Sequence, residues 1–491
     1  MSTDTGTRVE HVAARLRTEL GDDAVITDRA RLRTYECDGL AHYKVTPAVV
    51  VLPRTTGQVA DVVRACVEHG VPFVARGSGT GLSGGALPHA QGVLLVLSQM
   101  RDVIAVDPDD QRAVVQPGVI NLQVSRSAAP MGYYYAPDPS SQQICSMGGN
   151  VAENSGGAHC LKYGFTTNHV TGLELVVPDG SVVRLGGRAP DPPGYDLMGA
   201  FVGSEGTLGV TTEITVRLTR APEAVRTLLA AFPSTDEAGG AVSAVIGAGV
   251  VPAAIEMMDA LAIEAAEAAV HCHYPEGAGA VLVVELDGPA AEVEAQFVEV
   301  ERHCRDNRAF EIRIAADEAE RALFWKGRKS AFAAVGRISP DYIVQDGVIP
   351  RTALPEVLRR IAELSRGSGV RVANVFHAGD GNLHPLVLFD DGVPGEAEHA
   401  VQVSAAILDL CIEHGGSITG EHGVGMDKAK HMPRMYTDDD LDTMQMLRCA
   451  FDPAHLSNPG KVFPTPRLCG EIPGRHKGPH PLQTAGLAEV F

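Results

Sequence analysis

Two histidines and a glutamate are the residues most suited to hold a metal ion. His377 and His384 flank "AGDGNL", and the strand-like stretches "RVANVF" and "PLVLFD" predict one tight hairpin on which both imidazoles reach a common point. Glu421, in the glycine-fenced "TGEHGVG", would complete a set that leaves coordination positions open, as catalytic metal sites do. The spacing differs from HExxH and argues against a zincin protease. The residues alone leave open whether Glu421 meets the histidines, and a polar loop rim is the alternative.

Two further side chains suit the oxidation of a hydroxy acid. His422 follows Glu421 directly, and neighbours on a turn tend to face different ways, so His422 is free to act as a base beside the ion. A neutral imidazole is well suited to accept an alcohol proton near pH 7. In "FWKGRKSAF", Arg328 either grips a substrate carboxylate bidentately or belongs to a solvated basic surface.

Two glycine-rich stretches suit a large anionic ligand. "RGSGTGLSGG", residues 76–85, has GxGxG rather than GxGxxG spacing and opens no helix, so it is not a Rossmann fingerprint. Its backbone N–H groups can instead form a nest for a diphosphate, the alternative being a flexible turn. Residues 137–164 offer glycine pairs beside hydroxyls and amides, which suits a planar polar ligand; alone, such a stretch is more often a loop.

The elements that position these groups fall into two domains. Residues 47–75 read strand, helix and strand, with Thr55 and Gln58 spaced as a capping box, and "GLELVVPDGSVVRLGG" reads as a hairpin with a type I′ turn at Asp179-Gly180. Strands and helices then alternate in the manner of an α+β domain with an antiparallel sheet. We expect an N-terminal helical segment at 1–43, one domain at 44–222, a second at 223–437 and a C-terminal segment at 438–491.

Composition restricts the partners. With 41 basic and 61 acidic residues the formal charge is −20, and no basic run is present, which argues against nucleic acid. The N-terminus lacks a signal-peptide apolar region, and no stretch reaches the roughly eighteen apolar residues of a membrane span, so we expect a cytoplasmic protein. The nine cysteines include no CxxC, the closest pair being Cys145 and Cys160. Electrons leaving through an iron-sulfur cluster would therefore need another chain.

Together these motifs resemble the FAD-linked oxidoreductases of the vanillyl-alcohol oxidase and p-cresol methylhydroxylase superfamily, in the D-2-hydroxyacid dehydrogenase branch. Within it the chain is similar to the FAD-binding large subunits of glycolate oxidases. The resemblance covers residues 40–465 and rests on "ARGSGTGLSGGALP", "PDPSSQQICSMGGNVAENSGGAHCLKYG", "GSEGTLGV", "RKSAFAAVGRISPDYIVQDGVIPR", "NVFHAGDGNLHPLVLFD", "GSITGEHGVG" and "NPGK".

This resemblance implies an α+β fold with a two-lobed FAD-binding domain, an α+β cap, and a C-terminal segment that returns to the flavin. Asn458 would approach the isoalloxazine. The loop lacks the histidine that binds FAD covalently in some members and has Thr80, so we expect dissociable FAD. The implied cofactor-binding residues are Arg76, Gly77, Ser78, Gly79, Thr80, Gly81, Pro139, Ser140, Ser146, Gly149, Asn150, Gly156, Glu205, Val210 and Asn458.

The resemblance also implies the chemistry. His377, His384 and Glu421 would bind a divalent metal, Zn, Mn or Fe, and His422 would be the base. Pro385 and Leu386 stand where relatives that handle longer diacids have a polar residue, which favours a small 2-hydroxy acid such as glycolate or D-lactate. Hydride would pass to flavin N5. Electrons would then pass to separate flavin and iron-sulfur subunits, with peripheral membrane association through them, or to a quinone-linked acceptor.

Three other readings stay open at this point. The first is a D-lactate or D-2-hydroxyglutarate dehydrogenase with the same chemistry and a different pocket. The second is an oxidase that passes electrons directly to oxygen. The third is a flavin-binding electron-relay subunit that has no substrate of its own.

Overall fold

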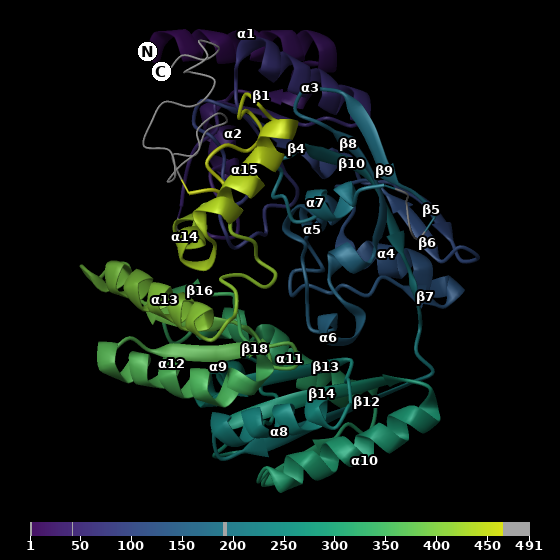
Figure 1. Ribbon diagram of the computed structural model, residues 1–491, viewed down its shortest axis with the longest axis vertical. Helices are drawn as coiled ribbons and strands as arrows, with labels where there is room; N and C mark the ends of the chain where they lie inside the picture. Colours follow the sequence, from purple (N-terminus) through teal and green to yellow (C-terminus); the bar gives the residue numbers. More distant parts are fainter. Residues whose placement is uncertain (1, 42, 190–193, 465–491) are drawn as a thin grey trace.

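The first lobe of the N-terminal domain lies at the top of Figure 1 and contains a four-stranded sheet, whose strand order is β1-β2-β4-β3. The computed structural model describes residues 2–41, 43–189 and 194–464. β2, β3 and β4 run parallel, and the short β1 joins antiparallel to β2. The strands are β1 (Val25–Ile26), β2 (Val49–Val51), β3 (Phe73–Arg76) and β4 (Val93–Val96), and the helices are α1 (Ser2–Leu20), α2 (Arg29–Leu32) and α3 (Thr56–His69). Because strand side chains alternate, α1 and α3 cover one face and α2 the other.

The second lobe is an antiparallel five-stranded sheet in the order β5-β6-β10-β8-β9. A two-stranded ribbon of β7 and β11 lies outside it. The strands are β5 (Val103–Asp107), β6 (Arg112–Val115), β7 (Tyr133–Tyr134), β8 (Val170–Val176), β9 (Val182–Gly186), β10 (Val210–Arg217) and β11 (Thr219–Arg220). The helices are α4 (Asn121–Ala128), α5 (Met147–Glu153), α6 (Cys160–Tyr163) and α7 (Leu197–Phe201).

Two local predictions hold in kind but differ in detail. Thr55 caps α3 by accepting from the Gln58 N–H, but the Gln58 side chain accepts from Arg54 N–H, one residue before the cap. The β8–β9 hairpin forms, but only Gly180 of the predicted turn pair has positive φ, at 82°. A type I′ turn needs positive φ at both central residues, so that turn type was wrong.

The second domain, here called the cap, is built on a nine-stranded sheet paired antiparallel throughout. Its strands are β12 (Ala224–Phe232), β13 (Ala254–Asp259), β14 (Ala280–Gly288), β15 (Glu311–Ile314), β16 (Asp341–Val344), β17 (Gly347–Val348), β18 (Val372–His377), β19 (Asn382–Leu383) and β20 (Pro385–Phe389). Its helices are α8 (Thr235–Gly247), α9 (Ala260–Val270), α10 (Ala290–Asp306), α11 (Glu318–Val335), α12 (Leu354–Ser368) and α13 (Glu396–Glu413).

Helices cover both faces of the cap sheet. α8, α10, α12 and α13 form a core with one face, and α9 and α11 form a core with the other. Leu228 and Ala230 of β12 enter the first core, while Leu229 and Ala231 enter the second. Double coverage explains why β12 and β14 read as continuous apolar runs rather than as alternating strands.

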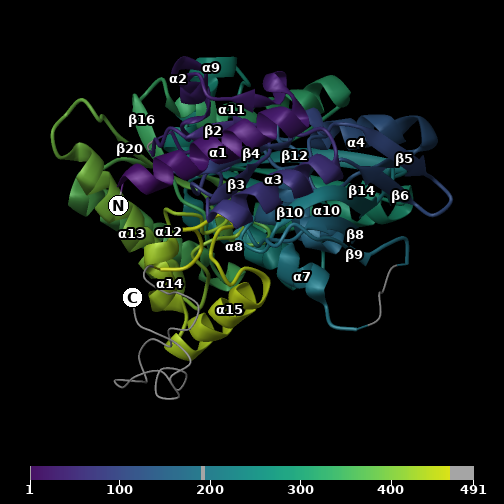
Figure 2. The same cartoon turned by 90° about the horizontal axis from the view of Figure 1, so that it is seen from above.

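The chain then returns from the cap to the first lobe (Figures 1 and 2). Residues 414–431 lead from α13 to α14 (Met432–Met435) and α15 (Asp438–Phe451). Beyond α15, Ser457 bridges Phe73 of β3, and the Asn458 N–H donates to the Phe73 carbonyl at 2.8 Å. The returning segment thereby lies beside the strand that opens the predicted diphosphate loop.

A charged joint links the two domains. His159, just before α6, places Nδ1 2.8 Å from Asp138 Oδ2 and Nε2 3.3 Å from Glu285 Oε1 of the cap. Glu285, on β14, also accepts from Trp325 Nε1 at 2.7 Å and from Arg321 at 2.9 Å. Burial alone would lower the pKa of His159, but the two carboxylates raise that pKa to about 10. The imidazole is therefore a cation held between the domains at neutral pH.

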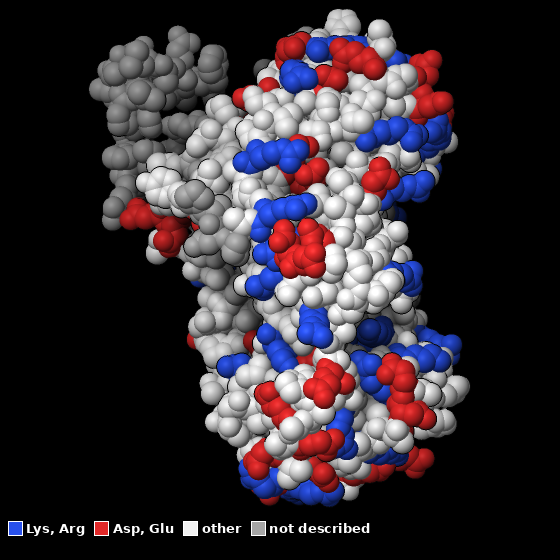
Figure 3. Space-filling view, turned by 90° about the vertical axis from the view of Figure 1, so that its right-hand side faces the viewer, with Lys and Arg blue, Asp and Glu red and all other residues white. Residues whose placement is uncertain are grey.

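Charged side chains of both signs are mixed on the surface. On the face in Figure 3, Lys and Arg side chains are interspersed with Asp and Glu rather than gathered into one basic area. Across the described part of the chain, none of the helices combines the length and the apolar character needed to cross a bilayer.

Candidate active site

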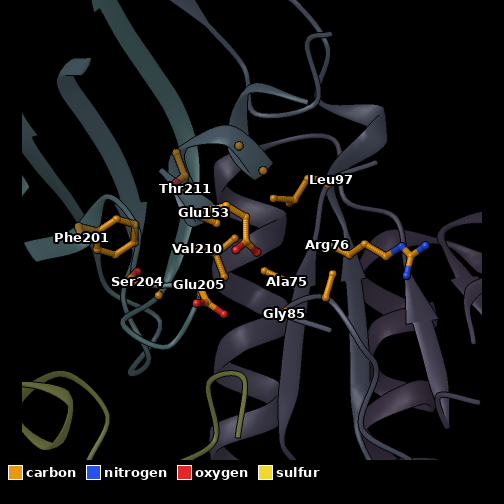
Figure 4. Close-up of a pocket in the computed structure, with 17 residues that line it drawn as sticks. Ala75, Arg76, Gly85, Leu97, Glu153, Phe201, Ser204, Glu205, Val210 and Thr211 are labelled. Atoms are coloured by element: carbon orange, nitrogen blue, oxygen red, sulfur yellow. The ribbon is translucent and has the colours of Figure 1, made fainter. Parts of the chain in front are cut away.

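A cavity lies between the two lobes of the first domain, where the flavin is expected (Figure 4). Of the predicted cofactor residues, five line it: Arg76, Gly77, Gly149, Glu205 and Val210. Other wall residues come from β3, α5 and β10, so both lobes contribute. The Arg76 side chain points away from the cavity and donates to the Cys37 carbonyl at 2.6 Å, which leaves its backbone as the lining part.

Close packing explains two of the glycines around this cavity. A Cβ on Gly77 would collide with Ser146 Oγ and lie 3.5 Å from Gly149 N. Ser146 Oγ accepts from the Ser78 N–H at 3.3 Å and so joins the loop to the start of α5. A Cβ on Gly39 would lie 2.7 Å from the Gly81 carbonyl, so the N-terminal segment also packs on the loop. The chain from β3 to β4 contains no helix, as predicted.

The remaining predicted flavin residues do not line the cavity, although Asn458 contacts its wall. Asn458 donates to the carbonyls of Gly85 and Glu205, at 2.9 and 2.6 Å, and both acceptors are wall residues. Asn150 is buried and accepts from Asn121 at 3.0 Å. The others that do not line the cavity are Ser78, Gly79, Thr80, Gly81, Pro139, Ser140, Ser146 and Gly156.

Two acids of the cavity lining, the half-buried Glu153 and the buried Glu205, direct their carboxylates toward the same region (Figure 4). Burial raises the pKa of Glu153 well above its usual range, with the Glu205 charge adding to the effect. Burial raises the pKa of Glu205 to about 7, although the N–H groups of Val424 and Gly425 oppose this. A glycine-walled cavity with buried polar groups and no covalent anchor at Thr80 fits a dissociable flavin.

The structure brings the three predicted metal ligands together. His377 ends β18 and His384 follows β19, and their ring centroids are 5.0 Å apart. Glu421 Oε1 lies 3.4 Å from His377 Nε2 and 3.2 Å from His384 Nε2, and one ligand atom from each residue falls within 4.8 Å of the others. Within the described residues, the buried His384 Nε2 and Glu421 Oε2 have no hydrogen-bond partner. This set fits a divalent ion with open positions.

Neighbouring groups orient both imidazoles. Glu256 lies opposite His377 in the β13–β18 register, and its Oε1 is 2.7 Å from His377 Nδ1. The Gln345 carbonyl lies 3.4 Å from His384 Nδ1. Both rings therefore direct Nε2 toward Glu421, which is the way carboxylates and carbonyls behind metal-binding histidines set their orientation.

Charge within this cluster is strongly polarised. Burial alone would raise the pKa of Glu421, but His377 and His384 hold it well below its usual range. Burial alone would lower the pKa of His377, but Glu256 and Glu421 hold it well above. The Glu421 carboxylate and the His377 imidazole thus stabilise each other's charged forms, and a divalent cation held here would supply the positive charge in place of the imidazolium.

His422 lies against the same cluster. Its ring stacks on His384 with centroids 4.9 Å apart, and its Nε2 is 3.8 Å from Glu421 Oε1. Burial lowers the pKa of His422 to about 4, although Asp346 opposes this, so the imidazole is neutral at neutral pH. His384 and His422 also form a second potential ligand set with Asp346, but backbone N–H groups already occupy that carboxylate.

Arg328 lies behind the predicted metal ligands. It is buried on α11, and its Nη2 is 2.6 Å from Glu256 Oε2, so Glu256 stands between Arg328 and His377. The solvated-surface reading of Arg328 is therefore wrong. Only the N–H groups that Glu256 does not occupy can serve a substrate carboxylate.

Sequence reasoning missed Glu256, Asp346 and Glu153 as members of the site. Glu256 and Asp346 are single acids in the mainly apolar stretches "AAIEMM" and "IVQDGVIP", and both are almost fully buried. A lone carboxylate within a mainly apolar stretch needs a partner if it is buried, and this is the signal that could have found them. Glu153 follows the glycine pair in "GGNVAE", and the local sequence does not distinguish it from an acidic residue on the surface of a helix.

Family comparisons match most of the chain. A model described as "FAD binding domain" matches residues 47–186, and one described as "FAD linked oxidases, C-terminal domain" matches residues 221–462. The second match crosses residue 437, the predicted end of the second domain, without a break. The domain limits given above therefore remain predictions.

Curated relatives align over nearly their whole length. The glycolate oxidase subunit GlcD of Escherichia coli strain K12 is 51% identical over 90% of this chain and 89% of its own. The subunit of the same name from Bacillus subtilis strain 168 is 40% identical over 87% and 92%. A D-lactate dehydrogenase from Anaerostipes hadrus is 31% identical over 87% and 91%.

Solved structures share the fold. p-Cresol methylhydroxylase with substrate bound superposes with a TM-score of 0.78 at 18% identity, over 93% of this chain and 97% of its own. The 4-ethylphenol oxidase from Gulosibacter chungangensis gives a TM-score of 0.77 at 18% identity, over 94% and 98%. The α+β architecture of a two-lobed domain plus a cap, of p-cresol methylhydroxylase type, is thereby confirmed.

Proposed function

The chain belongs to the family of FAD-linked oxidases and is a hydroxy-acid oxidoreductase, and from that membership we propose that it oxidises glycolate, or alternatively D-lactate, to the corresponding 2-oxo acid. The glycolate oxidase subunits at 51% and 40% identity support the first substrate, and the D-lactate dehydrogenase at 31% supports the second. The small size of the substrate rests on Pro385 and Leu386, of which Leu386 packs into the cap core.

One observation carries the proposal: the Glu421–His422 turn contacts both the predicted metal ligands and the lining of the flavin cavity. A Cβ on Gly423, the next residue, would collide with Glu153 Oε2 and lie 2.9 Å from Glu205 Oε1, and both acids line the cavity. A substrate bound at the cluster would therefore lie close to a flavin in the cavity. Such positioning converts a bimolecular encounter into an effectively unimolecular step.

The chemistry divides between bound groups and side chains. A divalent ion, Zn, Mn or Fe, held by His377, His384 and Glu421 would lower the pKa of the substrate hydroxyl, and FAD would accept hydride from the carbinol carbon. His422, neutral at neutral pH, would take the hydroxyl proton at Nε2, the nitrogen on the Glu421 side. The remaining N–H groups of Arg328 would hold the substrate carboxylate.

The electrons would then leave through separate flavin and iron-sulfur subunits. The relatives named glycolate oxidase subunits support this part of the proposal, as does the absence of any CxxC from the sequence. The enzyme would work in the cytoplasm and reach a membrane peripherally, through these partners.

Anaerobic flavin bleaching with a panel of D- and L-2-hydroxy acids tests this function, with metal content measured on the same sample. We expect glycolate or D-lactate to bleach the wild type. His422→Ala should keep FAD and metal but bleach about 10²-fold more slowly, the usual scale for losing a general base. Glu421→Gln should lose metal and activity together. Flavin that stays oxidised with every acid would favour an electron-relay subunit, and stoichiometric peroxide in air would favour an oxygen-using oxidase.

A further inference from the structure

The peptide groups of the Glu421–His422 turn are held by two carboxylates from elsewhere in the chain. Asp346 Oδ2 accepts the N–H groups of Gly420, Glu421 and His422 at 2.9, 3.1 and 2.8 Å. Further along the same segment, the N–H groups of Val424 and Gly425 donate to Glu205 at 2.6 and 2.7 Å. Backbone donors converge on each carboxylate as they do on a bound anion.

The two carboxylates come from different domains. Asp346 lies between β16 and β17 of the cap and is fully buried, with the buried ammonium of Lys428 3.3 Å away. Glu205 belongs to the FAD-binding domain and lines the flavin cavity. The start of the turn is anchored separately, because Ser417 pairs with Val348 of β17 through two backbone hydrogen bonds of 2.9 Å. Asp346 therefore does not serve merely to attach the segment to the sheet.

Resting on the roles proposed above for Glu421 and His422, we propose that Asp346 is the positioning residue of this site. The peptide N–H groups it accepts include those of both functional residues, so it fixes the backbone from which their side chains project. Charge-assisted hydrogen bonds are roughly twice as strong as neutral ones, which suits a carboxylate rather than an amide in this place. Asp346 touches neither substrate nor flavin in this scheme.

Asp346→Asn would remove the anion and leave the Lys428 ammonium buried without its partner. The double variant Asp346→Asn/Lys428→Met removes both charges. It therefore separates the effect of an unpaired Lys428 charge from the effect of losing the carboxylate that accepts the peptide N–H groups. Asp259→Asn is a matched control, because Asp259 is a half-buried cap carboxylate that accepts two backbone N–H groups, those of Ala262 and Asn374, rather than those of the turn.

The experiment measures amide hydrogen exchange and metal affinity in the full-length, FAD-loaded protein. In Asp346→Asn we expect exchange at residues 420–422 to rise at least about tenfold while 424–425 stay slow, because Glu205 still holds them. The dissociation constant for added Zn²⁺ or Mn²⁺ should rise about 10- to 100-fold. The double variant should regain thermal stability but not metal affinity, and Asp259→Asn should keep wild-type metal affinity.

Unchanged exchange at 420–422, or full recovery of metal affinity in the double variant, would overturn the positioning role. If Asp346→Asn does not fold, the double variant carries the same exchange measurement without an unpaired ammonium. A wild type that binds neither Zn²⁺ nor Mn²⁺ would refute the proposed metal site, while amide exchange would still decide the role of Asp346.

Discussion

Replacing His159 with glutamine tests the charged joint between the FAD-binding domain and the cap. The pKa of His159 is raised from its usual 6.5 to about 10, and its side chain is 22% exposed. A raised folded-state pKa means that the charged form stabilises the fold fully below about pH 6.5 and that this contribution is lost as the pH rises through about 10. Each pH unit in that window removes about 1.4 kcal/mol.

We therefore expect His159→Gln to lower the free energy of unfolding by about 4 kcal/mol at pH 7 and by only about 1 kcal/mol at pH 9. Urea unfolding followed by tryptophan fluorescence measures this difference. Trp325 is the only tryptophan, and its ring stacks on His159 with centroids 5.8 Å apart, so the signal reports on this joint.

His399→Gln is the control, because His399 is exposed on α13, and its stability should follow the wild type at every pH. The decisive result is how the difference in unfolding free energy between wild type and His159→Gln changes with pH. A gap between wild type and His159→Gln that stays constant from pH 7 to 10 would show that His159 is neutral in the folded protein, and the reasoning about the joint would be refuted.

Two further substitutions test the two halves of the active site. Glu256→Gln should weaken metal binding about 10- to 100-fold, because His377 loses the carboxylate that contacts its Nδ1. Chelator competition measures the dissociation constant for the metal. An unchanged dissociation constant would show that Glu256 does not orient His377. Gly77→Ala should yield protein that purifies without FAD, because its Cβ would collide with Ser146 Oγ. Gly57→Ala, in the open first turn of α3, is the control and should retain FAD, as judged by the visible flavin absorption. Full FAD occupancy in Gly77→Ala would contradict the close packing.

Local patterns predicted the parts of this fold that depend on neighbouring residues. The strand-helix-strand unit before the glycine loop, the β8–β9 hairpin and the histidine hairpin all form, because turn residues and apolar periodicity act over a few positions. The same patterns failed where detail depends on one φ angle, as at Asp179-Gly180, since Gly180 alone takes the positive value.

The sequence by itself determined the cofactor class, the overall architecture and the identity of the candidate ligands, because long motifs in fixed order carry that information. Only the tertiary structure decided that Glu421 meets His377 and His384, that Glu256 stands opposite His377, and that Asp346 holds the turn. The physical reason is register. Which residues face each other across β13 and β18, or across a turn and a distant loop, is set by the packing of the whole sheet, and no short stretch of sequence encodes it.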